Sequence, residues 1–108
     1  MKVFETNKQE PYFSYILSGK KTVEGRLNKG KFLEMQVGDI LKVNGSAEFI
    51  IIGKNVYTSF KEMIESEGLK NVIPDAVDVD EAVSVYRQFY SVEDELKYGV
   101  VAIGIKKT

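Results

Sequence analysis

The dipeptide Asn44-Gly45 constrains the fold of this chain more than any other local feature. It separates two apolar stretches, residues 39–43 and residues 47–57. Because asparagine and glycine tolerate the left-handed backbone of a tight turn, this arrangement predicts a β-hairpin over residues 39–57. The second strand contains Phe49 to Ile52, which is apolar on both faces. This predicts that the strand lies centrally in a sheet or barrel.

Alternating apolar residues predict two more strands, over residues 22–27 and 98–106. They also allow a short additional strand at Lys2 to Phe4. In the strand over residues 98–106, large side chains occupy one face, and the other face carries Val100, Ala102 and Gly104. The small face predicts close contact with a helix or a facing strand.

Helix signals divide the rest of the chain. A first helix follows Pro11 and ends at Gly19. A second begins at the capping box Ser59-x-x-Glu62, and a third begins at Asp78 with the apolar stripe Ala82, Tyr86, Phe89 and Tyr90. In 108 residues this order of elements predicts one α+β domain spanning residues 1–108. The expected architecture is a small mixed or antiparallel β-barrel flanked by helices.

The composition restricts the chemistry that the chain can carry out. There is no cysteine, which excludes disulfides, thiolate metal sites and cysteine nucleophiles. There is no histidine, which removes the usual general base at neutral pH and the commonest metal ligand. The acids of residues 75–81 match no calcium loop, and a solvated loop with a helix cap explains them. We therefore expect no metal site and no cofactor.

The charges are unevenly distributed although the formal net charge is only −1. Basic side chains dominate residues 20–31, whereas residues 75–81 are acidic. This predicts a locally positive surface on a nearly neutral molecule. The polar N-terminus is unlike a signal peptide, and the longest apolar run is too short to span a membrane. We therefore expect a cytoplasmic protein with no membrane partner.

The segment Ser18 to Arg26 is the densest polar grouping and the main candidate site. Lys20 and Lys21 fall at a predicted helix-to-strand turn, and Glu24 and Arg26 share one face of the strand. One interpretation is a half-exposed strand whose charges are solvated. The other is a site in which the basic groups contact an anion or a carbonyl. Strict alternation places Lys21 and Glu24 on opposite faces unless Lys21 belongs to the turn or a bulge intervenes.

Two further groups are candidate contacts for a nucleic acid. Tyr86 and Tyr90 offer stacking surfaces, although both lie on the predicted core stripe. Arg87 lies off that stripe, where it could contact phosphate. Ser59 precedes a predicted helix, whose free amides can bind an anion, although helix capping also explains this residue.

The order of several blocks points to a known family. Residues 19–26, Gly-Lys-Lys-Thr-Val-Glu-Gly-Arg, and the later Val37-Gly38-Asp39 match the pattern G-x-K-x-x-E-x-R followed by x-G-D. Blocks over residues 56–63, 85–90 and 98–103 complete the match. The chain thereby resembles the ASCH family of the PUA-like superfamily, and in particular its small stand-alone members from archaea and bacteria. The resemblance covers nearly the whole chain.

This resemblance implies a PUA-like β-barrel with helices on one side and a ligand cleft between them. It implies an RNA-binding or modified-nucleobase-binding module, and it allows protein partners, so a purely protein-binding adaptor is a third hypothesis. Our leading hypothesis is a module that binds RNA or a modified nucleoside through a set of polar side chains: Lys20, Lys21, Glu24, Arg26, Ser59 and Arg87.

The same resemblance also suggests an enzyme. Some small bacterial members hydrolyse the acetyl amide of N4-acetylcytidine with a lysine, a threonine and a glutamate. Lys21 matches that lysine, and Glu24 stands where the threonine would be. The alternative hypothesis is therefore a small amidohydrolase with Lys21 as base or nucleophile and with Glu24, or an acid from Asp75 to Asp80, handling protons.

Overall fold

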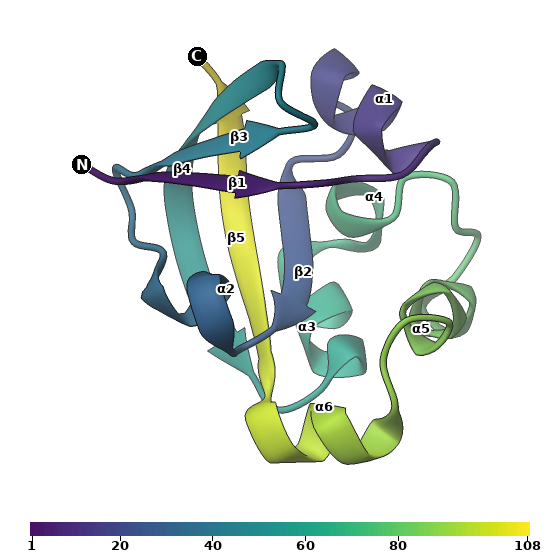
Figure 1. The fold of residues 1–108 in the computed structure, drawn as a ribbon. Helices are drawn as coiled ribbons and strands as arrows, with labels where there is room; N and C mark the ends of the chain where they lie inside the picture. Colours follow the sequence, from purple (N-terminus) through teal and green to yellow (C-terminus); the bar gives the residue numbers. More distant parts are fainter.

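Five strands form one curled mixed sheet, and six helices pack around it (Figure 1). This computed structural model describes every residue from Met1 to Thr108. The strands are β1 (Val3–Thr6), β2 (Val23–Leu27), β3 (Ile40–Val43), β4 (Ala47–Tyr57) and β5 (Val100–Lys107). The helices are α1 (Tyr12–Ser18), α2 (Gly30–Glu34), α3 (Phe60–Glu67), α4 (Leu69–Val72), α5 (Val79–Arg87) and α6 (Val92–Tyr98).

The strand order is β1-β3-β4-β5-β2. β1 runs parallel to β3, and the other neighbouring pairs are antiparallel. β1 and β2 are therefore the two edges of the sheet, which curls into a half-barrel (Figure 1). The predicted α+β class and the mixed barrel-like sheet with flanking helices are confirmed, and the short strand allowed near the N-terminus is β1.

The predicted hairpin is present between β3 and β4. Asn44 and Gly45 have φ values of 54° and 68°, the left-handed conformation that this turn requires. β4 lies between β3 and β5, as predicted for a central strand. Its apolar run is not buried on both faces, however, because Ile52 is 56% exposed. The register shifts between Ile51 and Gly53, so the alternation of buried side chains is interrupted there.

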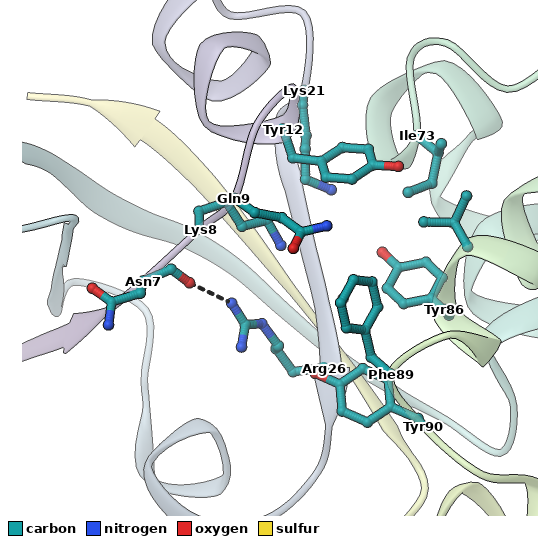
Figure 2. Close-up of a pocket in the computed structure, with 12 residues that line it drawn as sticks. Asn7, Lys8, Gln9, Tyr12, Lys21, Arg26, Ile73, Tyr86, Phe89 and Tyr90 are labelled. Atoms are coloured by element: carbon teal, nitrogen blue, oxygen red, sulfur yellow. Dashed lines mark hydrogen bonds between the residues drawn. The ribbon is translucent and has the colours of Figure 1, made fainter.

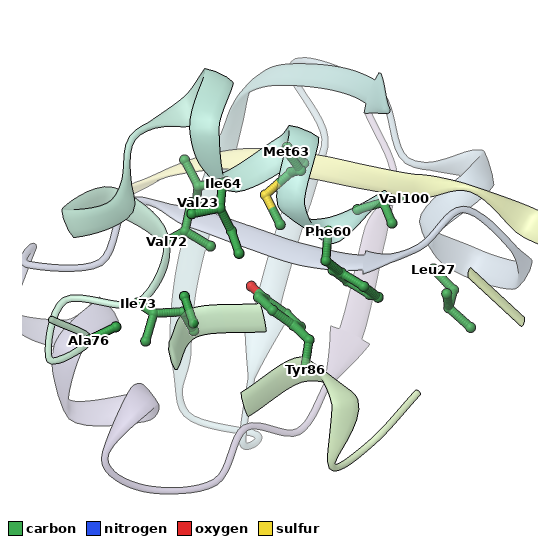
Figure 3. Packing of buried hydrophobic residues seen from close by; sticks show 12 residues of the cluster. Val23, Leu27, Phe60, Met63, Ile64, Val72, Ile73, Ala76, Tyr86 and Val100 are labelled. Atoms are coloured by element: carbon green, nitrogen blue, oxygen red, sulfur yellow. The ribbon is translucent and has the colours of Figure 1, made fainter. Parts of the chain in front are cut away.

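β5 separates two hydrophobic clusters. Val101, Ile103 and Ile105 point into the half-barrel, in contact with residues from β3 and β4. Val100 and Ala102 point the other way, into a cluster with α3 and α5 (Figure 3). The predicted close contact on the small-residue face is therefore confirmed: helices cover it.

Helix caps behave as the sequence predicted. Gly19 ends α1 with φ 83°, the side chain of Ser59 accepts a hydrogen bond from the N–H of Glu62, and Asp78 caps α5 in the same way. Three short helices, α2, α4 and α6, were not predicted, although Ser91 caps α6 by accepting from the N–H of Asp94. α5 ends at Arg87, so Phe89 lies beyond the helix and is 52% exposed rather than part of a core stripe. No helix is long and apolar enough to cross a membrane.

Candidate functional site

A cavity of about 450 Å³ lies where the free edge of β2 faces α5 (Figure 2). The segment between β1 and α1 forms one side of it, and α5 with the turn after it forms the other. This volume falls within the range of small-molecule sites, roughly 300–1,000 Å³. The lining residues are Asn7, Lys8, Gln9, Tyr12, Lys21, Gly25, Arg26, Ile73, Val85, Tyr86, Phe89 and Tyr90.

One wall of the cavity is cationic and is organised around the buried carboxylate of Glu24. This side chain is 1% exposed, and its oxygens lie 2.8 Å from Lys8 Nζ, 3.3 Å from Arg26 Nη2 and 3.7 Å from Lys21 Nζ. A carboxylate can be buried without a large cost only when such partners surround it. Three cations around one acid leave this wall with a local excess of positive charge.

The burial of this cluster changes the protonation of its members. Burial alone would raise the pKa of Glu24, but Lys8, Lys21 and Arg26 lower it to about 2. Burial lowers the pKa of Lys21 to about 7, although the charge of Glu24 acts in the opposite direction. At neutral pH Glu24 is therefore ionised, and Lys21 is close to the midpoint of its titration.

Lys21 belongs to the connection between α1 and β2, not to the strand itself. This placement lets its side chain reach Glu24 despite the strand alternation, which was the condition stated from the sequence. Its Nζ also donates to the carbonyl of Val23 at 2.7 Å and to the carbonyl of Val72, at the end of α4. Lys21 therefore ties the start of β2 to α4 while one side of it lines the cavity.

Arg26 bridges the two edges of the curled sheet. Its Nη2 donates to the carbonyl of Asn7, just after β1, at 3.2 Å (Figure 2). The guanidinium also lies 4.8 Å from the centre of the Phe32 ring, a cation–π contact. The charge of Glu24 raises the pKa of Arg26 despite the opposing effect of burial, so the guanidinium is charged at any pH of interest.

The opposite wall is aromatic and consists of Tyr12, Tyr86, Phe89 and Tyr90. Tyr86 and Tyr90 both stack on Phe60, and their ring centres lie 4.4 Å and 5.4 Å from the centre of the Phe60 ring. Figure 2 shows the hydroxyl of Tyr86 directed towards the cavity, and it has no hydrogen-bond partner in the protein. Burial raises the pKa of Tyr86, so this hydroxyl keeps its proton and can donate it.

The comparisons with known proteins identify the family. The family model described as ASCH domain matches residues 7–108. The chain belongs to the ASCH domain family. The crystal structure of hypothetical protein PH0355 is similar to this ASCH domain, with a TM-score of 0.95 and 47% identity over 100% of both chains.

A second solved structure agrees with this assignment. The solution NMR structure of protein PF0455 from Pyrococcus furiosus is similar, with a TM-score of 0.84 and 41% identity over 99% of this chain and 97% of that one. Among curated proteins no match is found. The ASCH resemblance inferred from the sequence is thus confirmed.

The structure of this ASCH domain brings together only part of the predicted site. Lys21 and Arg26 line the cavity, and Glu24 lies directly behind them. Lys20 is exposed and is not among the lining residues. Neither is Ser59, which caps α3.

Arg87 also lies outside the lining of the cavity. Its Nη2 contacts Glu95 Oε1 at 3.0 Å, and its Nη1 donates to the carbonyl of Tyr90 at 3.4 Å. The other oxygen of Glu95 accepts from the N–H of Phe60, so Arg87 stabilises the packing of α5, α6 and the start of α3.

Several lining residues were not predicted as site residues. Lys8 and Gln9 lie in an irregular segment with no periodic signal, and only the curl of the sheet brings them beside β2. Tyr12 was not singled out, and Phe89 was assigned to the core stripe. The end of α5 before Phe89 is the feature that exposes this ring.

Proposed function

We propose that the cavity binds one base of a single-stranded RNA, or a modified nucleoside, between the half-barrel and α5. The observation that carries this proposal is the combination of a cationic wall and an aromatic wall in one cavity of about 450 Å³. Sequence-specific RNA recognition uses unstacked bases that stack on aromatic side chains, while basic groups contact phosphate or carbonyl oxygens. The cavity offers both kinds of contact.

The side chains have different roles in this proposal. Lys8 and Arg26 are 14% and 18% exposed, so their charged ends are partly available to phosphate or carbonyl oxygens. Glu24 is too deeply buried to contact a ligand and instead orients these two cations. Phe89, half-exposed at the cavity, provides the stacking surface.

Phe89→Ala tests this proposal because the ring is 52% exposed and is not part of the hydrophobic core. Stacking of a base on an aromatic ring contributes roughly 1–3 kcal/mol, so the affinity for short single-stranded RNA should fall by roughly 5- to 150-fold. Fluorescence anisotropy at one fixed salt concentration measures this. Leu96→Ala is the matched control, because Leu96 is 78% exposed on α6 and lies outside the cavity.

The two variants have clear outcomes. A loss confined to Phe89→Ala supports a base in this cavity. Equal affinities of both variants and wild type, or no RNA binding by wild type, would refute the proposal.

The protonation of Lys21 favours a second candidate, hydrolysis of an N4-acylated cytidine. A lysine with a pKa of about 7 has a substantial neutral fraction at neutral pH, and only the neutral amine acts as base or nucleophile. Glu24 lies 3.7 Å away and could exchange protons with it. Against this, Lys21 Nζ already donates to two backbone carbonyls, which leaves it little freedom.

Incubation with N4-acetylcytidine tests the enzymatic candidate. If it is correct, acetate is released, the rate rises with pH through about 7, and Lys21→Met abolishes release. Lys20→Met is the matched control, because that neighbouring lysine is exposed. Absence of acetate release by wild type would remove this candidate and leave the binding module.

A further inference from the structure

The hydrogen bonds that flank β2 show which of its backbone N–H and C=O groups point towards β5 and which point towards the free edge. β2 pairs only with β5. Just before β2, the carbonyl of Thr22 accepts a hydrogen bond from the N–H of Ile105 in β5 at 2.9 Å. Just after β2, the N–H of Asn28 donates to the carbonyl of Gly99 at 3.0 Å. Backbone groups alternate in direction along an antiparallel strand. Even-numbered residues of β2 therefore face β5, and the odd-numbered residues face the free edge.

The carbonyls of two of the three residues that face the free edge have partners. The carbonyl of Val23 accepts from Lys21 Nζ at 2.7 Å, and the carbonyl of Leu27 accepts from the N–H of Lys29 at 2.9 Å. Gly25 lies between them, buried and in the lining of the cavity. No hydrogen bond outside the sheet involves its backbone, and the register directs it away from β5. Its N–H and C=O are thus an unpaired donor and acceptor side by side.

The unpaired hydroxyl of Tyr86 lies next to these groups. A Cβ atom on Gly25 would be only 2.6 Å from the Tyr86 hydroxyl oxygen, so this position requires glycine. Tyr86 is 5% exposed, and its hydroxyl has no partner in the protein. Buried polar groups are nearly always hydrogen-bonded. An unpaired N–H, C=O and O–H at one place therefore indicate a ligand that completes them.

We propose that Gly25 and Tyr86 recognise the edge of a uracil-type ring, in which one N–H lies between two carbonyls. The C=O of Gly25 accepts the ring N–H, its N–H donates to one carbonyl, and the Tyr86 hydroxyl donates to the other. This inference rests on the proposed function and specifies its ligand class.

The charges around the cavity and the order of the hydrogen-bonding groups favour this edge over those of cytosine and adenine. Lys8 and Arg26 add donors, whereas the one nearby carboxylate, Glu24, is already paired with three cations. The cavity therefore offers more donors than acceptors. Uracil places its one donor between two acceptors, which complements a donor–acceptor–donor set, whereas cytosine carries its amino donor at the end of the edge and adenine presents an amino group beside a single acceptor.

Single-stranded RNA oligomers of uridine, cytidine, adenosine and 3-methyluridine, all of equal length, test this inference. A well-formed pair of hydrogen bonds to a base edge discriminates strongly, so the uridine oligomer should bind roughly tenfold to a hundredfold more tightly than the cytidine and adenosine oligomers. The 3-methyluridine oligomer, which has lost the ring N–H, should show no such advantage. Equal binding of the uridine and 3-methyluridine oligomers would overturn the inference.

Tyr86→Phe and Phe89→Ala separate this inference from the proposed function. Tyr86→Phe keeps the ring on Phe60 and removes one donor, so it should reduce the uridine preference several-fold with little effect on the other oligomers. If binding depends on Phe89 but all oligomers bind alike, the base preference fails and the proposed function stands. If no oligomer shows dependence on Phe89, the proposed function fails, and the inference with it.

Discussion

At the scale of single residues, the site depends on Glu24 and the cations around it. An ionised carboxylate without partners would cost several kcal/mol in this buried position. Arg26 was expected beside Glu24 because side chains two apart on a strand share a face. Lys8 could not be predicted, because it comes from an irregular segment that only the tertiary fold places 2.8 Å from Glu24.

The stability of the protein should reflect the ionisation of Glu24 at acid pH. Its pKa falls from 4.5 to about 2 because the three cations outweigh the effect of burial. The folded protein then holds this proton more weakly than the unfolded chain does. The stabilisation is complete above pH 4.5 and is lost as the pH falls through 2. The difference in unfolding free energy between wild type and Glu24→Gln should shrink by about 3 kcal/mol over this interval.

Urea unfolding of both proteins over a pH series measures this difference. If it stayed constant from neutral pH down to about 2, the account of a strongly stabilised Glu24 carboxylate would be wrong.

Lys21 should affect stability at the alkaline end. Burial lowers its pKa from 10.5 to about 7, so between these values the unfolded chain binds a proton that the folded protein does not. Unfolding free energy therefore rises with pH across this interval. Over this interval the unfolding free energy of wild type should rise by on the order of 4 kcal/mol relative to that of Lys21→Met. Urea unfolding checks this, and the exposed Lys20→Met, which retains Lys21, should follow the same pH dependence as wild type. A parallel pH dependence of wild type and Lys21→Met would contradict it.

At the scale of elements, the contact between β2 and the helices α3 and α5 shapes the cavity. Gly25 allows it, because a Cβ atom there would lie 2.5 Å from Met63 Cε and 2.6 Å from the Tyr86 hydroxyl. The alternation of residues 22–27 predicted this strand. The contact of β2 with α3 and α5 was not predicted, because these helices are far from β2 along the chain.

Gly25→Ala should therefore destabilise the protein. Overpacking of a filled interior costs typically about 1–3 kcal/mol. Tyr86→Phe in the same chain should recover part of this loss, because it removes one of the two close contacts. Thermal and urea unfolding measure both effects. Gly53→Ala is the control, since nothing lies within 4 Å of its added Cβ. A fully stable Gly25→Ala variant would mean that β2 and the helices are not in such close contact.

The elements predicted from sequence were those with a local signal. The Asn44-Gly45 turn, the caps at Ser59 and Asp78, and the alternating strands are local, and all are present. α2 and α4 have five and four residues, too few to show a helical period, whereas the capping signal Ser91-x-x-Asp94 of α6 was not recognised. The end of α5 was missed because the apolar spacing continues to Tyr90 although the helix stops at Arg87.

At the scale of the whole molecule, a net charge of −1 is combined with a small cationic wall. Only Lys8 and Arg26 present partly exposed charges there, since Lys21 is 1% exposed. Family and fold could be recognised from blocks spread along the sequence. The cavity could not be predicted, because it is assembled from four separate segments that meet only in the folded protein.

The salt dependence of RNA binding should consequently be weak. For single strands the slope of log K against log salt is about −0.7 per phosphate neutralised, so two cations give a slope of about −1.5. Anisotropy titrations over a range of salt concentrations measure it. A slope steeper than about −3.5, equivalent to five or more phosphates, would show that binding uses a broad basic surface and not this cavity.

The most direct test of the central claim is NMR titration of the ¹⁵N-labelled protein with a short uridine-rich RNA. The account predicts that the largest amide shifts occur at Gly25, Lys8 and Phe89, which line the cavity, and that Ser59 and Lys20, which do not, change little. Shifts concentrated at Ser59 and Lys20, with the Gly25 amide unaffected, would contradict the claim that this cavity is the binding site.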